Sequence, residues 1–546
     1  MINTKILAHA NILVKKQDFA SAEKIYLEIL AKSPKNDIVM SFLGRLYIKM
    51  KRYKAAERIL EKAYNIRKTA PTIASLAFCK FKIKKFDESV ILYEELFKYD
   101  PDSIKIYEKI IDAFRALNMY NFSHAYAQKL YLKHPDKENS YVRLTQSYID
   151  IGEIKKAEET CAKTIQKFPR SGLIWIIAGN LQEYCYCNEE MAQNCYQTAI
   201  DYGNSSGYYH LAVSYTKVGK YKEAETCYEK MLEIFPEEDY VKAGLGMLYL
   251  TQKQMKKGYE NFFKREKIKE VQNLKNQWIG EILENETLLL YCDHGFGDII
   301  QFIRYLPVLS QKCNNIIVKT RPELLELLKI SFPKDEYKNI MFTCDLQNIK
   351  YDKYVLSTDL PYYLNLDFDN IPYPDGYLKY DLQKKNYFKE KYFNNDKLKI
   401  GLCWRAGDFG LRSAMNRTIN IDYFKKLLEM KDVQFYSFQK DDIFDGCKKY
   451  PQITDLSKEL NDFNDTAAAL MNIDILISAD TACLHLAGAL GKKAYLLIPY
   501  CADWRWFNNN KKTEWYSSVE IFKQQDRQDW FIEVNKIFEK LKDLLK

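Results

Sequence analysis

The turn Gly295-Phe296-Gly297-Asp298 contains residue types that suit chemistry. Glycines let backbone approach a ligand closely, and a helix that begins there presents free N–H groups and a positive dipole end. The carboxylate of Asp298 can accept a proton from an attacking hydroxyl, which is the work of a general base. A structural alternative stays open, because Asp is also preferred where a helix start is capped.

A second turn runs from Ser478 to His485 with the sequence SADTACLH. Asp480 and Thr481 are cap-type residues, and the helix start behind them suits a diphosphate. His485 follows Thr481 by four residues, so both fall on one helix face, where the imidazole can donate to a phosphate oxygen. The structural alternative is a capped helix with a satisfied, partly buried histidine.

Both turns follow apolar strands in the second half of the chain. The segments 286–298, 314–320 and 353–364 supply strands, and helical spacing in 299–311 and 322–330 separates them. Strand–helix–strand order predicts a parallel sheet. Residues 370–396 are rich in Tyr, Pro and Asn with little apolar period, and we interpret them as a connection between domains.

A second alternating unit follows this connection. Its expected strands are 399–407, 433–439, 474–480 and 493–499, and its expected helices are 421–430, 461–472, 481–491 and 527–545. Two parallel α/β halves joined by a linker place a cleft between the carboxyl ends of both sheets, where doubly wound sheets bind ligands.

The first half of the chain is repetitive. Its prolines recur at intervals of one or two copies of a period near 34 residues, at Pro34, Pro101, Pro135, Pro169 and Pro236. Small and large residues alternate between them in a fixed pattern, so that small ones let two helices approach closely and large ones fill the groove. The pattern resembles the tetratricopeptide repeat family, with about seven units over 1–236 and an altered eighth reaching about 270.

Composition excludes several classes of protein. The 546 residues are 47% hydrophobic and carry a net charge of +9, too mild and too evenly spread to require a nucleic-acid partner. The N-terminus lacks the pattern of a signal peptide, and apolar runs fall short of a membrane span, so we expect a cytoplasmic protein with no transmembrane segment. The 13 cysteines form no C-x₂-C pair, which argues against a zinc ribbon or a disulfide framework.

The motifs of the second half agree, in order, with one bacterial group of proteins. The matching segments are QWIGE (277–281), HGFGDIIQFIRYLP (294–307), CWRAG (403–407) with NRTI (416–419), FYSFQ (435–439), ITDL (453–456) with DFNDTAA (462–468), DTACLHLAGALGK (480–492) and LIPYCADWRW (497–506). That group fuses tetratricopeptide repeats to a glycosyltransferase module similar to the lipopolysaccharide heptosyltransferases of family 9. Its layout is similar to that of the protein O-GlcNAc transferases.

The resemblance implies a GT-B glycosyltransferase with two Rossmann-like lobes. It implies an inverting enzyme that takes a nucleotide sugar as donor substrate and needs neither a metal nor another cofactor. Asp298 matches the general base of the family. The residues implied in nucleotide-sugar binding are Gly295, Gly297, Arg405, Arg417, Gln439, Asp480, Thr481 and His485.

Two features bear on the donor pocket. Positive charge from Arg405, Arg412, Arg417 and helix termini has to stabilise the departing diphosphate if no metal does so. The sequence also departs from the group, because Asp293-His294 stands where related modules usually carry Glu-Gln, and Arg405 stands where a small residue is common. Trp504 and Trp506 can stack on a sugar or base, or form core.

Three functions fit these observations. The first is transfer of a sugar to a hydroxyl of a protein or peptide that the repeats hold. The second is a catalytically degenerate scaffold whose repeats bind other proteins, and the third is transfer to a glycan or lipopolysaccharide acceptor. The expected domains are a repeat superhelix over 1–270, an acceptor-side lobe over 271–385 and a nucleotide-sugar-binding lobe over 386–546.

Overall fold

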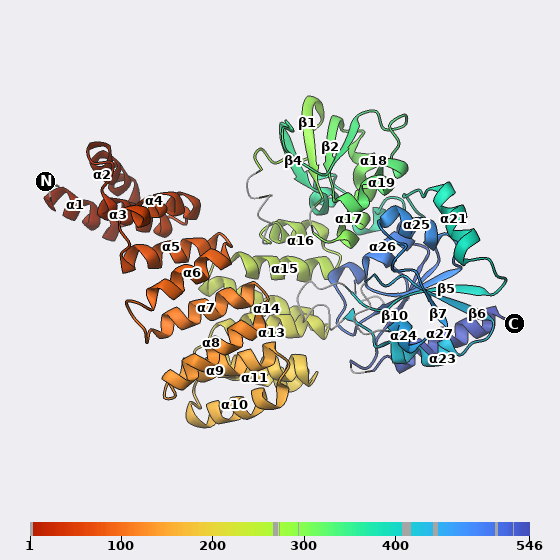
Figure 1. The fold of residues 1–546 in the computed structure, drawn as a ribbon, viewed down its shortest axis with the longest axis horizontal. Helices are drawn as coiled ribbons and strands as arrows, with labels where there is room; N and C mark the ends of the chain where they lie inside the picture. The colour runs from red at the N-terminus through yellow and green to blue at the C-terminus, as the bar shows by residue number, and fades with distance from the viewer. Residues whose placement is uncertain are drawn as a thin grey trace. The chain divides into compact units, whose positions relative to one another are not determined.

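A computed structural model describes residues 4–265, 271, 274–292, 294–406, 417–440, 446–507, 511–527 and 529–546. By internal packing, the chain divides into two compact units, residues 1–207 and residues 208–546. The first unit is helical, whereas the second continues the helices and then adds two parallel sheets (Figure 1).

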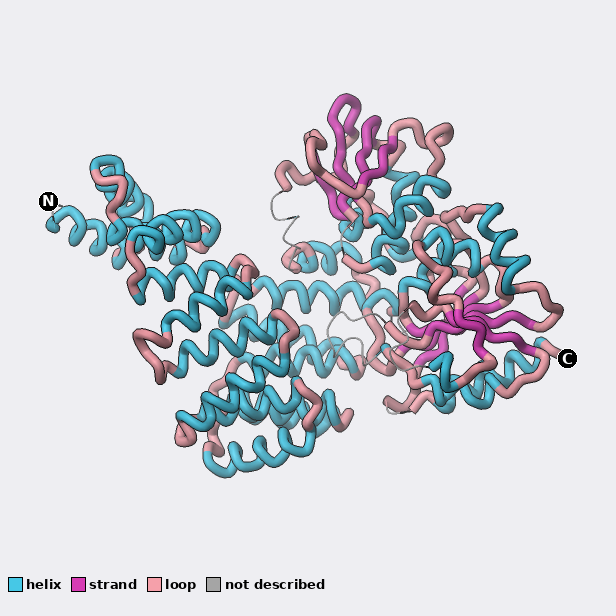
Figure 2. Tube along the Cα trace, viewed as in Figure 1, coloured by secondary structure: helices cyan, strands magenta, loops and turns pink. Residues whose placement is uncertain are grey.

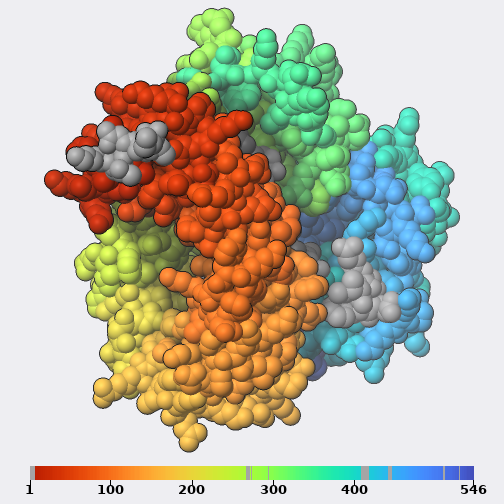
Figure 3. Space-filling view, turned by 60° about the vertical axis from the view of Figure 1, so that its left-hand side comes forward, coloured from red at the N-terminus to blue at the C-terminus, as the bar shows by residue number. Residues whose placement is uncertain are grey.

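Antiparallel helical hairpins build the first unit, in which each odd-numbered helix pairs with the next (Figure 1). The helices are α1 (Thr4–Lys15), α2 (Phe19–Lys32), α3 (Asp37–Lys49), α4 (Tyr53–Ile66), α5 (Ala70–Lys82), α6 (Phe86–Leu96), α7 (Ile104–Ala116), α8 (Tyr120–Lys133), α9 (Glu138–Asp150), α10 (Ile154–Lys167), α11 (Gly172–Cys185) and α12 (Glu189–Asp201). In Figure 3 they follow one another as contiguous bands from red to yellow.

Small residues set the distance within a hairpin. A Cβ on Gly44 of α3 would lie 2.4 Å from Cγ of Leu60 in α4. Similarly, a Cβ on Gly179 of α11 would lie 2.3 Å from Cε1 of Tyr196 in α12. Because both distances are far below van der Waals contact, a Cβ at either position would force the facing side chain to move, so glycine permits the close approach of the two helices that the repeat pattern predicts.

Polar contacts one repeat apart join neighbouring hairpins. Arg67 pairs with Asp37 at 2.6 Å, and Arg143 pairs with Asp112 at 2.7 Å, across 30 and 31 residues of sequence. Lys133 reaches Asp102 at 2.7 Å across the same 31-residue interval. Each hairpin is therefore tied chiefly to its sequence neighbours, as expected for a repeat array.

The helical repeats continue into the second unit. Two more hairpins are formed by α13 (Ser206–Lys217) with α14 (Tyr221–Ile234), and by α15 (Asp239–Thr251) with α16 (Met255–Phe262). The described part of the chain thus holds sixteen solenoid helices up to Phe262. The expected seven regular units and an altered eighth are confirmed.

The first sheet holds four parallel strands in the order β3-β2-β1-β4. Figure 2 draws the strands of both sheets in magenta. Its strands are β1 (Leu283–Tyr291), β2 (Cys313–Lys319), β3 (Ile340–Thr343) and β4 (Lys353–Leu356). Leu288 of β1 lies beside Ile316 of β2 on one side and Lys353 of β4 on the other. The strands β2 and β3 are added in turn on one side of β1 and β4 is added on the other side, so the strand order reverses at β1.

The second sheet holds six parallel strands in the order β10-β9-β8-β5-β6-β7. Its strands are β5 (Leu398–Cys403), β6 (Val433–Ser437), β7 (Ile453–Asp455), β8 (Ile475–Ala479), β9 (Ala494–Ile498) and β10 (Val519–Lys523). Counted from β5, this is the order 3-2-1-4-5-6 of a doubly wound sheet, with its switch point between β5 and β8.

Helices cover both faces of the six-stranded sheet. Along β8, Leu476 packs with one hydrophobic cluster, whereas Ile475 and Ile477 pack with the other. The first face is covered by α25 (Phe463–Leu470) and α26 (Ala482–Ala489), and the second by α23 (Lys425–Leu428) and α27 (Phe531–Leu544). Burial on both faces explains why β8 and β9 are continuous apolar runs.

Several elements differ from the sequence-based expectation. Residues 370–396, expected to be a connection, contain the helix α21 (Leu382–Tyr392), whose polar surface hides its period because only Phe388 is buried. The helix expected over 299–311 is broken into α17 (Phe296–Phe302), the 3₁₀ turn η2 (Ile303–Tyr305) and α18 (Leu306–Leu309). Pro307 explains the break, since it cannot donate to the carbonyl of Ile303 and clashes with it.

Three strands were not expected from the sequence, namely β3, β7 and β10. They lie toward the outer edges of their sheets and are only three to five residues long. Among the described residues, helices that could cross a membrane are absent, because none is both long and apolar enough.

Candidate functional site

The predicted residues gather at the carboxyl ends of strands that flank the two switch points. Asp298 lies on α17, which follows β1. Asp480, Thr481 and His485 follow β8, and Arg405 follows β5, the strand beside it. The switch points are the places where doubly wound sheets open for a ligand.

Asp298 makes two contacts. Its Oδ2 accepts a hydrogen bond of 3.1 Å from the backbone N–H of Gly295, which precedes the helix, so the capping alternative is present in the structure. Its Oδ1 accepts from Nη2 of Arg505, forming an ion pair. The Asp298 side chain is 23% exposed. It is thus held from two sides and still reaches solvent.

Arg505 is the cation at the centre of this arrangement. Besides Asp298, its guanidinium donates to Oδ1 of Asp503 at 2.8 Å and to Oε1 of Gln301 at 3.1 Å. It also stacks over the Trp504 ring at 4.7 Å. Burial alone would lower the pKa of Arg505, but the negative charges of Asp298 and Asp503 raise it above its ordinary value. Sequence reasoning used the motif 502–506 only for its tryptophans and missed this arginine.

The two predicted turns meet at Gly297. A Cβ on this residue would lie 2.8 Å from Cδ2 of His485, on the facing helix α26. Glycine is therefore required for close packing of α17 on α26, a reason that involves no ligand. The contact brings Asp298 and His485 together, although 187 residues separate them in sequence.

His485 is buried and surrounded by aromatic rings. Its Nδ1 lies 2.9 Å from the hydroxyl of Tyr516, and its ring stacks on Trp506 with 5.5 Å between centroids. Its Nε2 lies 3.6 Å from Oδ1 of Asp480. The structural alternative of a satisfied, partly buried histidine is therefore realised, and the same contacts fix the orientation of the imidazole.

Asp480 is the buried carboxylate of the site, with 7% of its surface exposed. Burial alone would raise its pKa, but the hydrogen bond from His485 and the charges of His485 and Arg417 lower it below the ordinary value of 3.8. Nη1 of Arg417 lies 4.0 Å from Oδ2 of Asp480. Arg417, placed here from a loose motif, thus does reach the turn after β8.

Two further predicted residues, Thr481 and Gln439, make contacts with the backbone around them. Thr481 begins α26 and accepts from the N–H of Leu484 at 3.4 Å. Oε1 of Gln439 accepts from the N–H of Arg405 at 2.9 Å, which ties the end of β6 to the loop after β5. The carbonyl of Gln439 is therefore engaged within the protein. Asp293, Gly407 and Arg412 lie outside the described residues.

Chemically, the site combines two carboxylates with three arginines and a histidine. Arg405, Arg417 and His485 line the turn region after β5 and β8, and Arg505 stands beside Asp298. Such an arrangement can stabilise negative charge that develops on a diphosphate, while the partly exposed carboxylate of Asp298 nearby can take a proton.

Comparison with known proteins identifies tetratricopeptide repeats at residues 13–76 and 205–238. Protein FlbA of Caulobacter vibrioides is 20% identical over 584 residues, spanning 99% of this chain and 90% of FlbA. Similar solved structures include a tetratricopeptide protein of Thermus thermophilus (16% identity, 33% of this chain and 100% of that one, TM-score 0.31). A tetratricopeptide protein of Parabacteroides merdae is also similar (13% identity, 45% of this chain and 98% of that one, TM-score 0.40). So is yeast Tom70 (16% identity, 46% of this chain and 56% of that one, TM-score 0.39).

The helical hairpins are therefore tetratricopeptide repeats, and an α/β part with two parallel sheets follows them. Such repeats commonly mediate binding between proteins, through the surface that the stacked hairpins form.

Proposed function

We propose that this chain is a GT-B glycosyltransferase that moves a sugar from a nucleotide sugar to a hydroxyl of a protein or peptide acceptor. The observation that carries the proposal is the meeting of two switch-point turns, with Asp298 and Arg505 on one side and Asp480, His485 and Arg417 on the other. The family resemblance of the same motifs supports it.

The donor is assigned to the six-stranded sheet. Its strand order is that of nucleotide-binding sheets, and α26 begins at the switch point with Thr481 as its cap. The diphosphate would lie near this helix start, where His485, Arg417 and Arg405 supply donors and positive charge. In an inverting, metal-independent reaction these groups take on the stabilisation of the leaving diphosphate.

The role of general base is assigned to Asp298. Its carboxylate would accept the proton of the acceptor hydroxyl while the oxygen forms its bond to the sugar and the bond to the diphosphate breaks. Arg505 and the N–H of Gly295 orient the carboxylate, so little motion is needed before reaction. The repeats would hold the acceptor, which is their usual task toward proteins.

One observation favours a different function. Both carboxylate oxygens of Asp298 have partners within the protein, an arginine and a capped N–H. A transferase module that has become structural would retain such contacts, and the chain would then act as a scaffold through its repeats.

The decisive experiment compares Asp298→Asn with the parent protein in transfer assays. Asn keeps the shape and the capping contact but removes the base, so we expect turnover to fall by about 10²–10⁴-fold with donor affinity nearly unchanged. Asp543→Asn, at the exposed end of α27 beside Lys546, is the matched control and should transfer normally. Normal transfer by Asp298→Asn would refute the assignment of the base.

Donor binding is measured separately with a panel of nucleotides and nucleotide sugars. A donor at about 100 times its Kd should stabilise the fold by about 2.7 kcal/mol. His485→Ala and Arg417→Ala should each weaken that binding by about 1–3 kcal/mol, as expected when a phosphate loses a charged or buried donor. If the whole panel leaves the melting temperature unmoved, the scaffold function is favoured.

A further inference from the structure

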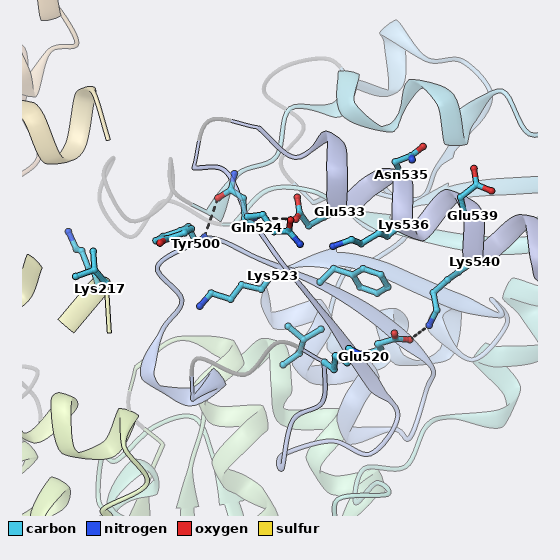
Figure 4. Close-up of a pocket in the computed structure, with 15 residues that line it drawn as sticks. Lys217, Tyr500, Glu520, Lys523, Gln524, Glu533, Asn535, Lys536, Glu539 and Lys540 are labelled. Carbon is cyan, nitrogen blue, oxygen red and sulfur yellow. Dashed lines mark hydrogen bonds and ion pairs between the residues drawn. The ribbon is translucent and has the colours of Figure 1, made fainter. Parts of the chain in front are cut away.

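A cavity of about 810 Å³ lies in the second unit, apart from the switch-point site. It is bounded by the edge strand β10, by α27, by Tyr500 after β9 and by the end of the solenoid helix α13 (Figure 4). The volume falls within the range of about 300–1,000 Å³ that small-molecule sites occupy.

The lining of this cavity is basic. Five lysines face three glutamates, namely Lys217, Lys511, Lys523, Lys536 and Lys540 against Glu520, Glu533 and Glu539. Two of the acids are engaged by lysines at the margin, because Glu520 pairs with Lys540 at 2.5 Å and Glu539 lies 3.9 Å from Lys426. The charge left toward the interior is therefore positive.

Figure 4 shows how the lysines are directed. Lys523 extends from β10 toward Lys217, and Lys536 extends from α27 toward Glu533. Burial lowers the pKa of Lys523, and an anion beside it would offset that loss of solvation. Lysine ammonium groups are compact donors that suit phosphate oxygens.

Glu533 is a buried acceptor in the same wall. Only 1% of its surface is exposed, and burial raises the pKa of its carboxyl group. Its Oε1 accepts from the N–H of Gln525 at 3.1 Å, whereas its Oε2 has no hydrogen-bond partner among the described residues. A buried acceptor without a partner is unfavourable in a folded protein, so a hydroxyl donor supplied by a ligand would satisfy it.

The walls of the cavity are held in place by contacts that do not involve the side chains of its lysines and glutamates. The thiol of Cys501 donates to the carbonyl of Lys217 at 3.8 Å, which fastens the end of α13 to the loop after β9. The N–H of Tyr500 donates to Oε1 of Gln524 at 3.2 Å. The cavity is thus bounded on two sides by fixed backbone.

We infer that this cavity is a binding site for a phosphorylated polyhydroxyl compound, such as a sugar phosphate. The phosphate would lie among Lys523, Lys511 and Lys536, and a hydroxyl would donate to the free oxygen of Glu533. The inference is independent of the proposed transfer reaction, because it uses none of the residues assigned to donor or base.

The test is calorimetric titration of the full chain with glucose 6-phosphate, inorganic phosphate and glucose. We expect glucose 6-phosphate to bind at least ten-fold more tightly than either of the others. Lys523→Gln and Lys536→Gln should each weaken glucose 6-phosphate binding at least five-fold. Lys546→Gln, an exposed lysine paired with Asp543 outside the cavity, is the matched control and should bind as the parent protein does.

Glu533→Gln separates the hydroxyl contact from the phosphate contact. It should reduce the preference for glucose 6-phosphate over inorganic phosphate about five-fold without weakening inorganic phosphate, because a neutral acceptor makes a weaker hydrogen bond. Equal binding of glucose 6-phosphate by the lysine variants and the parent would overturn the inference. So would loss of binding in His485→Ala, since the ligand would then occupy the switch-point site. Absence of binding at millimolar glucose 6-phosphate would overturn it as well.

Discussion

The solenoid and the α/β part are held together at different ranges. In the first unit, polar contacts such as Arg67–Asp37 and Arg115–Asp150 join neighbouring hairpins across 30 and 35 positions of sequence. In the α/β part, Arg304 donates to the carbonyl of Trp515 across 211 residues, and Arg505 reaches Asp298 across 207. Local contacts add up repeat by repeat, whereas the long-range ones exist only when the whole unit is folded.

Two ion pairs, one from each unit, differ in how deeply they are buried. Arg143 and Asp112 in the solenoid retain 25% and 23% exposure. Arg265 and Asp359 in the second unit retain 7% and 0%. Solvated pairs contribute little to stability, but a buried charge that loses its partner is strongly unfavourable. Equivalent substitutions in these two pairs should therefore have very different consequences.

The largest effect is expected for Arg265→Leu. The substitution leaves the carboxylate of Asp359 buried without the arginine that neutralises it, and we expect a loss of about 3–5 kcal/mol in the free energy of unfolding. Urea denaturation of the second unit measures it. The double variant Arg265→Leu with Asp359→Leu should recover much of the loss. A loss below about 1 kcal/mol in the single variant would show that burial does not make this pair more sensitive than the solvated pair Arg143–Asp112.

An intermediate effect is expected for Gly246→Ala in the eighth hairpin. The new Cβ would lie 2.5 Å from the backbone N of Phe262 and 2.8 Å from the backbone O of Gly258, so α15 and α16 must separate. We expect a loss of about 1–3 kcal/mol. In Gly44→Ala the new Cβ would contact only the Leu60 side chain, which can rotate. We therefore expect a smaller loss in the free energy of unfolding for this variant in the same urea measurement. Equal losses in the two variants would mean that the Leu60 side chain accommodates a new Cβ no better than the backbone of α16 does.

A small effect is expected for Arg143→Ala in the solenoid. The pair with Asp112 is partly solvated, so its removal should lower the free energy of unfolding by about 0.2–1 kcal/mol. The loss should shrink further in high salt. A loss as large as that of Arg265→Leu would erase the contrast between the two ion pairs.

The smallest effect concerns the pH dependence of Asp480. Its pKa is lower in the folded protein than the ordinary 3.8, so it stabilises the fold above about pH 4, and that contribution disappears as pH falls through the folded pKa. Melting temperatures of the parent protein and Asp480→Asn should therefore converge as pH falls from 5 toward 2. A constant difference over that range would show that the carboxylate charge is not involved.

The candidate site was predictable only in part. Asp298, Thr481 and His485 stand out because turn residues follow apolar strands, which is a pattern local in sequence. Arg505 and Tyr516 gave no such signal, since their importance comes from contacts with Asp298 and His485. The placement of Gln439 near a nucleotide stays a prediction, and the structure adds that its side-chain carbonyl accepts from the N–H of Arg405. Such partners depend on which loops the sheet order brings together, and spacing along the chain does not encode that order.

By itself, the sequence determined the repeat array and the alternation of strands and helices. The 34-residue period, glycines such as Gly44 and the apolar run of β8 act through neighbours within one hairpin or one strand. Only the tertiary structure decided that Gly297 packs on His485, that Arg505 neutralises Asp298 and that Glu533 borders a lysine-lined cavity. Those contacts arise when strands distant in sequence become neighbours in a sheet, and this topology depends on the packing of the whole unit.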